Sequence, residues 1–266
     1  MPAIDVAQVR SEAAEIVPLY ADPEAFAAAT REFFETHSAP VLRQSSIVSI
    51  SAPLKAYGTP LPIMRLMLGA IRKPASADLQ RTILAVKHLW ADPIREQRYL
   101  AMELLGVVTA AAPDQAVALM RLWLISLDDL ELIDLLADRV AAPWLLGNFR
   151  ERAAEARQWV NSPHKYQRRF GVAALGALVK ERHFEDVTSA LAALTTVMRE
   201  SDPEVRKSVA HVLRDLSAHG LGEVARFLIE WAGTIDKNTH WIVRHAVDKL
   251  DADARDRVMA ILRGKG

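Results

Sequence analysis

A single aspartate occupies a position that arginines hold elsewhere along the chain. Asp134 lies in the segment LDDLELIDLLADRV, residues 127–140, and segments of similar pattern recur every 35 to 38 residues. In each, the matched residue is followed three places later by a small or aliphatic one that begins a buried seam. The matched positions are Arg98, Asp134, Arg169, Arg206 and Arg244. Because equivalent positions of a stacked helical repeat line up on one surface, this column is a candidate functional groove.

The cations of this column suit a polyanion. Guanidinium and ammonium groups repeated along one surface match a phosphate backbone, and adjacent aromatic side chains match sugars or bases. The candidate nucleic-acid-binding residues around Arg169 are Lys165, Tyr166, Arg168, Arg206, Lys207, Trp241 and Arg244. A structural alternative stays open, in which the same arginines tie neighbouring repeats together through ion pairs with acids such as Glu204 or Asp248.

Asp134 would serve chemistry rather than affinity in such a groove. A carboxylate repels phosphate, so its presence costs affinity unless a reaction needs it. An N-glycosidic bond breaks through an oxocarbenium-like sugar, and a nearby carboxylate can stabilise that cation or orient the attacking water. A base alkylated at a ring nitrogen is already cationic and leaves without a general acid, so one aspartate would suffice. A solvated or salt-bridged aspartate is the alternative interpretation.

Other site chemistries lack their signatures. The chain has no cysteine, which excludes disulfides, thiolate nucleophiles and cysteine-ligated metals. The eight histidines form no HExxH pattern, and His240 and His245 are five residues apart and share no helix face. Phosphate-binding glycine motifs and a GxSxG elbow are also missing. We therefore expect no metal site.

Composition predicts a folded protein without bulk charge. Apolar residues make up 51% and charged residues 25% of the chain, which allows a large core. The formal net charge is zero, so a polyanion site must come from local arrangement. The first twenty residues lack the apolar run of a signal peptide, and no segment approaches the ~20 apolar residues that cross a bilayer. We expect a soluble, cytoplasmic protein.

The elements that position these residues all have the helical period. Prolines mark the predicted helix starts, and four of them follow a capping residue: Asp22-Pro23, Asp92-Pro93, Ser162-Pro163 and Asp202-Pro203. Further breaks are predicted at Ala112-Pro113, Ala142-Pro143, Gly220 and Gly222. The predicted helices cover 4–17, 23–36, 62–73, 77–90, 93–110, 114–125, 129–140, 148–160, 163–180, 184–198, 203–217, 221–232, 238–249 and 252–263.

Asp134 belongs to the short predicted helix 129–140. Asp128 can cap this helix, and Glu131 three residues later completes a capping box. The apolar stripe of the helix consists of Leu127, Leu130, Ile133, Leu136 and Ala137, and Asp134 stands beside it.

Paired helices that repeat every 35 to 40 residues predict an all-α fold, a HEAT-like α-solenoid of stacked antiparallel helix pairs with a concave basic groove. We expect a single domain over residues 1–266, with residues 1–50 forming its N-terminal helices. Residues 44–62 are the least helical stretch and are expected to be a loop-rich connection.

Several segments, taken in order, resemble the AlkC/AlkD superfamily of DNA alkylation repair proteins over about residues 50–250. They are Tyr57–Arg65, Leu89–Pro93 with Glu96, Arg98 and Ala101, Trp159–Ser162 followed by Arg169, Val205–Ala210 and Trp241–Ala246.

The resemblance implies a monomeric solenoid that cradles duplex DNA in its concave face. It implies a monofunctional glycosylase of base excision repair that releases N3- or N7-alkylated purines without metal or cofactor and without fully flipping the lesion. Asp134 matches the catalytic aspartate of the family and Arg169 its phosphate-gripping arginine. Such a protein would be cytoplasmic and associated with the nucleoid when bound to DNA.

Two positions depart from the family pattern. AlkD-like enzymes place tryptophans against the deoxyribose of the lesion, at positions that align with Leu130 and Ser208 here. Trp123, Tyr166 or Trp241 are the candidate substitutes. Two alternatives therefore stay open: a non-catalytic repeat protein that binds damaged or branched DNA, and a protein-interaction scaffold whose arginines are internal.

Overall fold

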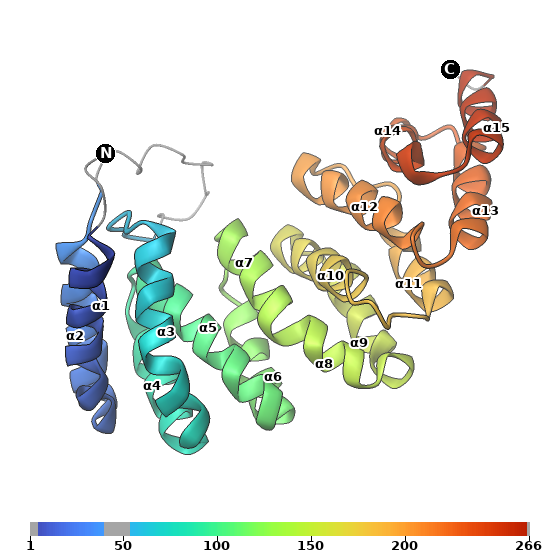
Figure 1. Ribbon diagram of the computed structural model, residues 1–266. Helices are drawn as coiled ribbons and strands as arrows, with labels where there is room; N and C mark the ends of the chain where they lie inside the picture. Colours follow the sequence, from blue (N-terminus) through green and yellow to red (C-terminus); the bar gives the residue numbers. More distant parts are fainter. Residues whose placement is uncertain (1–4, 40–53, 265–266) are drawn as a thin grey trace. The chain divides into compact units, whose positions relative to one another are not determined.

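The computed structural model describes residues 5–39 and 54–264, and these residues are almost entirely helical (Figure 1). The one β pairing among them is an isolated bridge between Lys55 and Ile94. The predicted all-α fold is confirmed. The chain divides into two compact units, Met1–Leu135 and Leu136–Gly266. Of the helices described, none is both long and apolar enough to span a membrane.

The first unit is a stack of helices in two layers. In one layer α3 packs against α1 and α5, and in the other α2 packs against α4. α4 and α5, which follow one another in the chain, make the most extensive contact. The helices are α1 (Val6–Ile16), η1 (Val17–Ala21), α2 (Pro23–Thr36), α3 (Leu61–Ala77), α4 (Leu79–Ala91), α5 (Arg95–Ala111), α6 (Pro113–Leu124) and α7 (Leu130–Leu136).

The second unit repeats this layered packing more regularly. One layer runs α10, α12, α14, and the other runs α9, α11, α13, α15, with each helix packed on the next of its layer. The helical-repeat prediction is confirmed, since Arg169, Arg206 and Arg244 fall on successive helices of one layer. The elements are η3 (Ala137–Ala141), α8 (Ala142–Gly147), α9 (Phe149–Val160), α10 (Lys165–Leu178), α11 (Val187–Leu194), η4 (Thr195–Val197), α12 (Pro203–Leu216), α13 (Leu221–Ala232), α14 (Lys237–Ala246), η5 (Val247–Lys249) and α15 (Ala252–Arg263).

Two of the four predicted Asp/Ser-Pro helix starts are confirmed. The Asp22 carboxylate accepts hydrogen bonds from the first backbone N–H groups of α2, and Asp202 does the same for α12. Each helix then begins at the proline, whose fixed φ suits the first turn.

The other two predicted starts are wrong by two residues. The Asp92 carboxylate accepts from the backbone N–H of Ile94, and the Ser162 hydroxyl from that of His164, so each closes a turn ahead of the helix. α5 begins only at Arg95 and α10 at Lys165. An Asp or Ser before proline can form either motif, and the local sequence does not choose between them.

The start of α7 differs from its prediction by one residue. Asp129, not Asp128, caps the helix, since its carboxylate accepts from the backbone N–H groups of Glu131 and Leu132. The Glu131 carboxylate is held by Arg95 in place of the predicted capping box. Arg95 also binds Asp129, with 2.7 Å between Nε and Oδ2.

The predicted break at Ala142-Pro143 is wrong. Ala141 and Ala142 both have right-handed helical dihedrals, and the π-helical turn η3 leads directly into α8. Pro143 follows the π-helical turn, so helical residues precede and follow it although it has no backbone N–H to donate. Helix therefore extends to Gly147, beyond the predicted end at residue 140.

Gly220 and Gly222 have different roles. Gly220 follows the end of α12, where its N–H donates to the Leu216 carbonyl, and it is also the N-cap residue of α13. A Cβ at Gly220 would stand 3.0 Å from the Val187 methyl groups, so glycine permits this approach. Gly222 lies inside α13, and the prediction that it ends a helix is wrong.

The predicted loop 44–62 is described only in part. Residues 44–53 lie outside the described residues, and 54–60 are non-helical up to the start of α3 at Leu61.

Candidate nucleic-acid interface

Asp134 lies on α7 and is half-buried. Its neighbours Ile133 and Leu136 are fully buried, so the carboxylate stands beside the apolar stripe as predicted. Leu130, one turn earlier, is half-exposed although the stripe was expected to bury it. Whether Asp134 shares a surface with the arginines of the second unit stays a prediction.

In the first unit, the arginine of the column is held by aromatic rings. The Arg98 guanidinium lies 4.6 Å from the ring centroid of Trp90, and its Nε donates to the Asp92 carbonyl. Trp90 in turn stacks on Trp123, with 4.1 Å between centroids. Burial lowers the pKa of Arg98, and the carboxylates of Asp128 and Asp92 oppose that shift. Trp123 is 5% exposed, so it is buried in this stack and does not present a ring to a ligand.

Arg169 fastens α10 to the first turn of α12. Its Nη1 donates to the backbone carbonyl of Glu204 at 3.0 Å and to the Ser208 hydroxyl at 2.5 Å. The same hydroxyl donates to the Glu204 carbonyl one turn earlier. If Arg169 binds a phosphate as expected, it has to do so while it donates hydrogen bonds to α12.

Arg206 makes the equivalent contact one repeat later. Its Nη1 donates to the Asn238 side-chain oxygen at 2.7 Å, and its guanidinium lies 4.7 Å from the Trp241 ring centroid. The other neighbour of Trp241 is the His245 ring, 3.8 Å away between centroids. The Arg206 Nε is buried, and no residue described here accepts a hydrogen bond from it. α12 is thus tied to the first turn of α14.

Both arginines tie neighbouring helices of the layer together, as the structural alternative expects, but the contacts described above are hydrogen bonds to uncharged acceptors and not the expected ion pairs with Glu204 or Asp248. The acceptor at Glu204 is its backbone carbonyl, not its carboxylate, and Asn238 replaces the expected acid. Arg168 does form an ion pair, with Glu200: the Nε–Oε2 distance is 2.6 Å, and the Glu200 side chain is 4% exposed. Arg168 also donates to the carbonyls of Ser162 and Pro163.

Three of the candidate nucleic-acid-binding residues, Arg244, Lys207 and Lys165, stay at the surface. Arg244 is exposed and has no hydrogen-bond or ion-pair partner within residues 5–39 and 54–264. Lys207 is exposed and forms an ion pair with Glu204 of the same helix, at 3.2 Å. Lys165 lies 4.0 Å from Asp202 and 4.8 Å from the ring centroid of Tyr166. These three are the predicted residues whose charge is available to a polyanion.

Part of the motif near residue 60 has a structural explanation. The buried Glu96 carboxylate accepts hydrogen bonds from the backbone N–H groups of Tyr57, Gly58 and Thr59. Gly58 has φ of 74°, a conformation that favours glycine. Tyr57-Gly58-Thr59 and Glu96 therefore belong together because they brace the start of α3 against α5.

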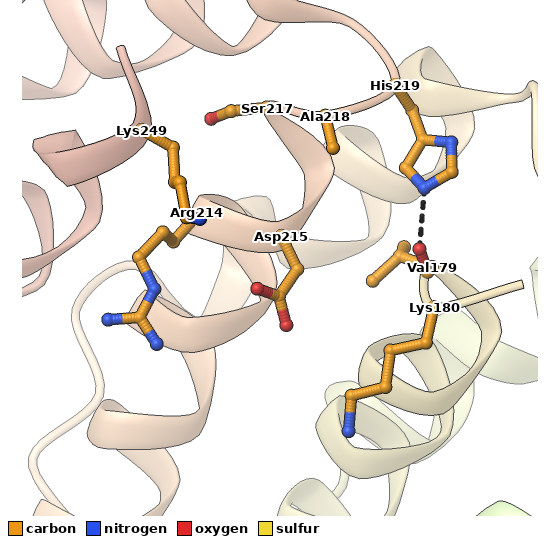
Figure 2. Close-up of a pocket in the computed structure, with 8 residues that line it drawn as sticks. All are labelled: Val179, Lys180, Arg214, Asp215, Ser217, Ala218, His219 and Lys249. Carbon is orange, nitrogen blue, oxygen red and sulfur yellow. Dashed lines mark hydrogen bonds between the residues drawn. The ribbon is translucent and has the colours of Figure 1, made fainter. Parts of the chain in front are cut away.

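The sequence reasoning missed a basic pocket at the far end of the same layer (Figure 2). Lys180, Arg214 and Lys249 line it, together with Asp215 and His219. The missed signal was spacing: in the predicted helix 163–180, Lys180 follows Arg169 by eleven residues, which is three helical turns. Clusters of three or more His, Asp or Glu side chains that could hold a metal are absent from the described part of the chain.

Comparison with known proteins decides the family. A family model described as "DNA alkylation repair enzyme" matches residues 21–250, which include the whole column from Arg98 to Arg244. The chain belongs to this family. No curated protein matches it.

Two solved structures share the fold of this DNA alkylation repair family member. One is smu.31 from Streptococcus mutans UA159, with 18% identity, TM-score 0.56 and coverage of 70% of this chain and 96% of that chain. The other is AlkD2 from Streptococcus mutans, with 18% identity, TM-score 0.54 and coverage of 71% of this chain and 100% of that chain. At this identity the likeness concerns the helical-repeat fold.

Proposed function

We propose that the protein is a monofunctional DNA glycosylase that releases N3- or N7-alkylated purines from duplex DNA in base excision repair. The observation that carries the proposal is the family match over residues 21–250, which includes Asp134 at the one acidic position of the column. In this proposal the protein acts as a monomer in the cytoplasm, on nucleoid DNA.

Asp134 has the chemistry that this reaction needs. The bond between the sugar C1′ and the alkylated base breaks first, and the cationic base leaves as a neutral molecule. The Asp134 carboxylate stabilises the oxocarbenium-like sugar and orients the water that adds to C1′. A proton is lost from that water, and the product is an abasic site.

The cations divide between two tasks. Arg169 and Arg206 hold successive helices of the layer in place through Glu204, Ser208 and Asn238. The exposed charges of Lys165, Lys207 and Arg244 are left to contact phosphates.

Base release from alkylated DNA tests the proposal. Wild-type protein should release 3-methyladenine or 7-methylguanine from methylated duplex DNA, measured by chromatography of the freed bases. Asp134→Asn should reduce release at least ~100-fold, the scale expected for loss of an electrostatic stabiliser, while DNA binding survives. Asp138→Asn is the matched control, since Asp138 is an exposed acid one turn later that pairs with Arg139. Unchanged release by Asp134→Asn would remove this residue from the mechanism.

One observation favours a second function, a DNA-binding repair protein without glycosylase activity. Ser208 stands where the resemblance expects an aromatic residue, and its hydroxyl accepts a hydrogen bond from Arg169, the expected phosphate ligand. Leu130, at the other such position, is aliphatic. This function predicts duplex binding that weakens with salt and no base released from any methylated substrate. A protein that neither binds DNA nor releases a base would instead fit the interaction scaffold.

A further inference from the structure

A basic pocket of about 490 Å³ lies where the C-terminal ends of α10 and α12 meet η5, within the second unit (Figure 2). Lys180 follows α10, Arg214 lies in the last turn of α12, and Lys249 ends η5. In Figure 2 the Asp215 carboxylate lies between the side chains of Arg214 and Lys180. Val179, Ser217, Ala218 and His219 complete the lining.

The charge of this pocket is not neutralised within the described chain. Three cations face one carboxylate, and neither Lys180, Arg214 nor Lys249 forms an ion pair or hydrogen bond with any described residue. The Nε2 atom of His219 lies 2.6 Å from the Val179 carbonyl and is occupied by that hydrogen bond. The pocket therefore has a surplus of two positive charges, and an anion is the complementary ligand.

The pocket lies at the other end of α10 from Arg169. Arg169 lies in the second turn of α10 and Lys180 lies two residues beyond the end of that helix at Leu178, so the helix between them spans about 14 Å along its axis. The His211 imidazole of α12 is affected by cations of both groups. Burial lowers its pKa, and the charges of Arg214, Arg169 and Lys180 lower that pKa further, whereas the charge of Asp215 raises it. Cations at both ends of the layer thus act on the same side of α12.

We propose that the pocket of Lys180, Arg214 and Lys249 binds a backbone phosphate of duplex DNA, on the strand opposite to the one that lies at the N-terminal ends of α10 and α12. The inference rests on the proposed function and adds a second strand contact to it. A separation of about 14 Å along the helix, to which the residues beyond its end add, is close to that of phosphates across a major groove roughly 12 Å wide, once the size of the phosphates is added. Asp215 weakens this contact.

The purely structural interpretation of the three cations is that they offset the negative ends of the helix dipoles. It predicts that their removal lowers the melting temperature and leaves DNA binding intact. The two interpretations therefore separate in a binding experiment in which stability is also measured.

The test compares two triple variants that lose the same total charge. Lys180→Ala/Arg214→Ala/Lys249→Ala removes the pocket cations, and Arg226→Ala/Arg255→Ala/Arg257→Ala removes exposed cations from α13 and α15 in the other layer. Affinity for a 20-base-pair duplex and for a single strand of equal length is measured by fluorescence anisotropy at several salt concentrations.

The pocket variant should bind the duplex about tenfold more weakly than the control variant, and its plot of log affinity against log salt should be flatter by about 0.9 for each phosphate lost. Single-strand affinity should fall equally in the two variants, because one strand does not reach both ends of the layer.

Three results would overturn the inference while the proposed function stands. The first is equal duplex affinity of the two variants, and the second is an equal loss of affinity for duplex and for single strand in the pocket variant. The third is that millimolar inorganic phosphate abolishes the difference in duplex affinity between the two variants, which would indicate a site for free phosphate. If wild-type protein binds no duplex at all, the proposed function fails and this inference fails with it.

Discussion

The two ends of the layer α10, α12, α14 use the same residue types in opposite ways. At the N-terminal ends, Arg168, Arg169 and Arg206 are bound by Glu200, Glu204, Ser208 and Asn238 of neighbouring segments. At the C-terminal ends, Lys180, Arg214 and Lys249 surround a pocket and have no partner within residues 5–39 and 54–264. A basic residue in a repeat protein therefore does not indicate a ligand until its local acceptors are known.

The largest expected difference in stability is between two substitutions of a carboxylate by an amide, one at each end of the layer α10, α12, α14. Glu200→Gln should destabilise the protein by about 2–3 kcal/mol, because it leaves Arg168 without its anionic partner in a largely buried pair. Urea-induced unfolding measures the change. An unaltered unfolding midpoint would mean that the Arg168–Glu200 pair adds nothing to stability.

The counterpart at the pocket is Asp215→Asn. This carboxylate lies among unpaired cations, so its loss should change stability by less than about 0.5 kcal/mol. It should raise duplex affinity roughly threefold, since one repulsive charge near a phosphate is removed. Weaker duplex binding by Asp215→Asn, measured by fluorescence anisotropy, would contradict the assignment of the pocket to a phosphate.

A smaller contrast is expected along the arginine column itself. Arg206→Ala should cost about 2 kcal/mol, because it removes a charged hydrogen bond to Asn238 and the stacking on Trp241. Arg244→Ala should leave stability unchanged and weaken DNA binding, since Arg244 is exposed. Thermal melting and DNA titration of both variants check this, and equal melting temperatures would show that Arg206 is not a structural tie.

At the hydrogen bond between Arg169 and Ser208 a single substitution should cost less than at Arg206: Ser208→Ala should destabilise the protein by about 1 kcal/mol, because the hydroxyl that Arg169 contacts is lost. If Arg169 becomes freer to grip phosphate in this variant, duplex affinity should rise slightly. A fall in both stability and affinity would show that Arg169 needs Ser208 to be positioned for DNA.

The helices and their repeat were predictable because they depend on local pattern. Asp22 and Asp202 cap α2 and α12 as expected, since capping involves atoms only a few residues apart. The sequence did not show whether Asp128 or Asp129 caps α7. Both are aspartates, and the cap is the residue next to the first one with helical dihedrals. The break predicted at Ala142-Pro143 is wrong because the sequence does not show that η3 continues into α8.

Much less of the candidate site was predictable. The sequence places Arg169 and Glu204 near each other in adjacent repeats, but an ion pair and a hydrogen bond to the backbone carbonyl fit the same spacing. The pocket needs Lys180, Arg214 and Lys249 from three elements that meet only in the folded layer.

The sequence alone determined the helical class, the repeat of 35 to 38 residues and the solitary acid among the arginines, because each of these is a property of spacing along the chain. The tertiary structure alone decided which cations have partners and which have none among the described residues. A long arginine side chain can reach several acceptors, and only the packing of neighbouring helices determines which one comes within 3 Å.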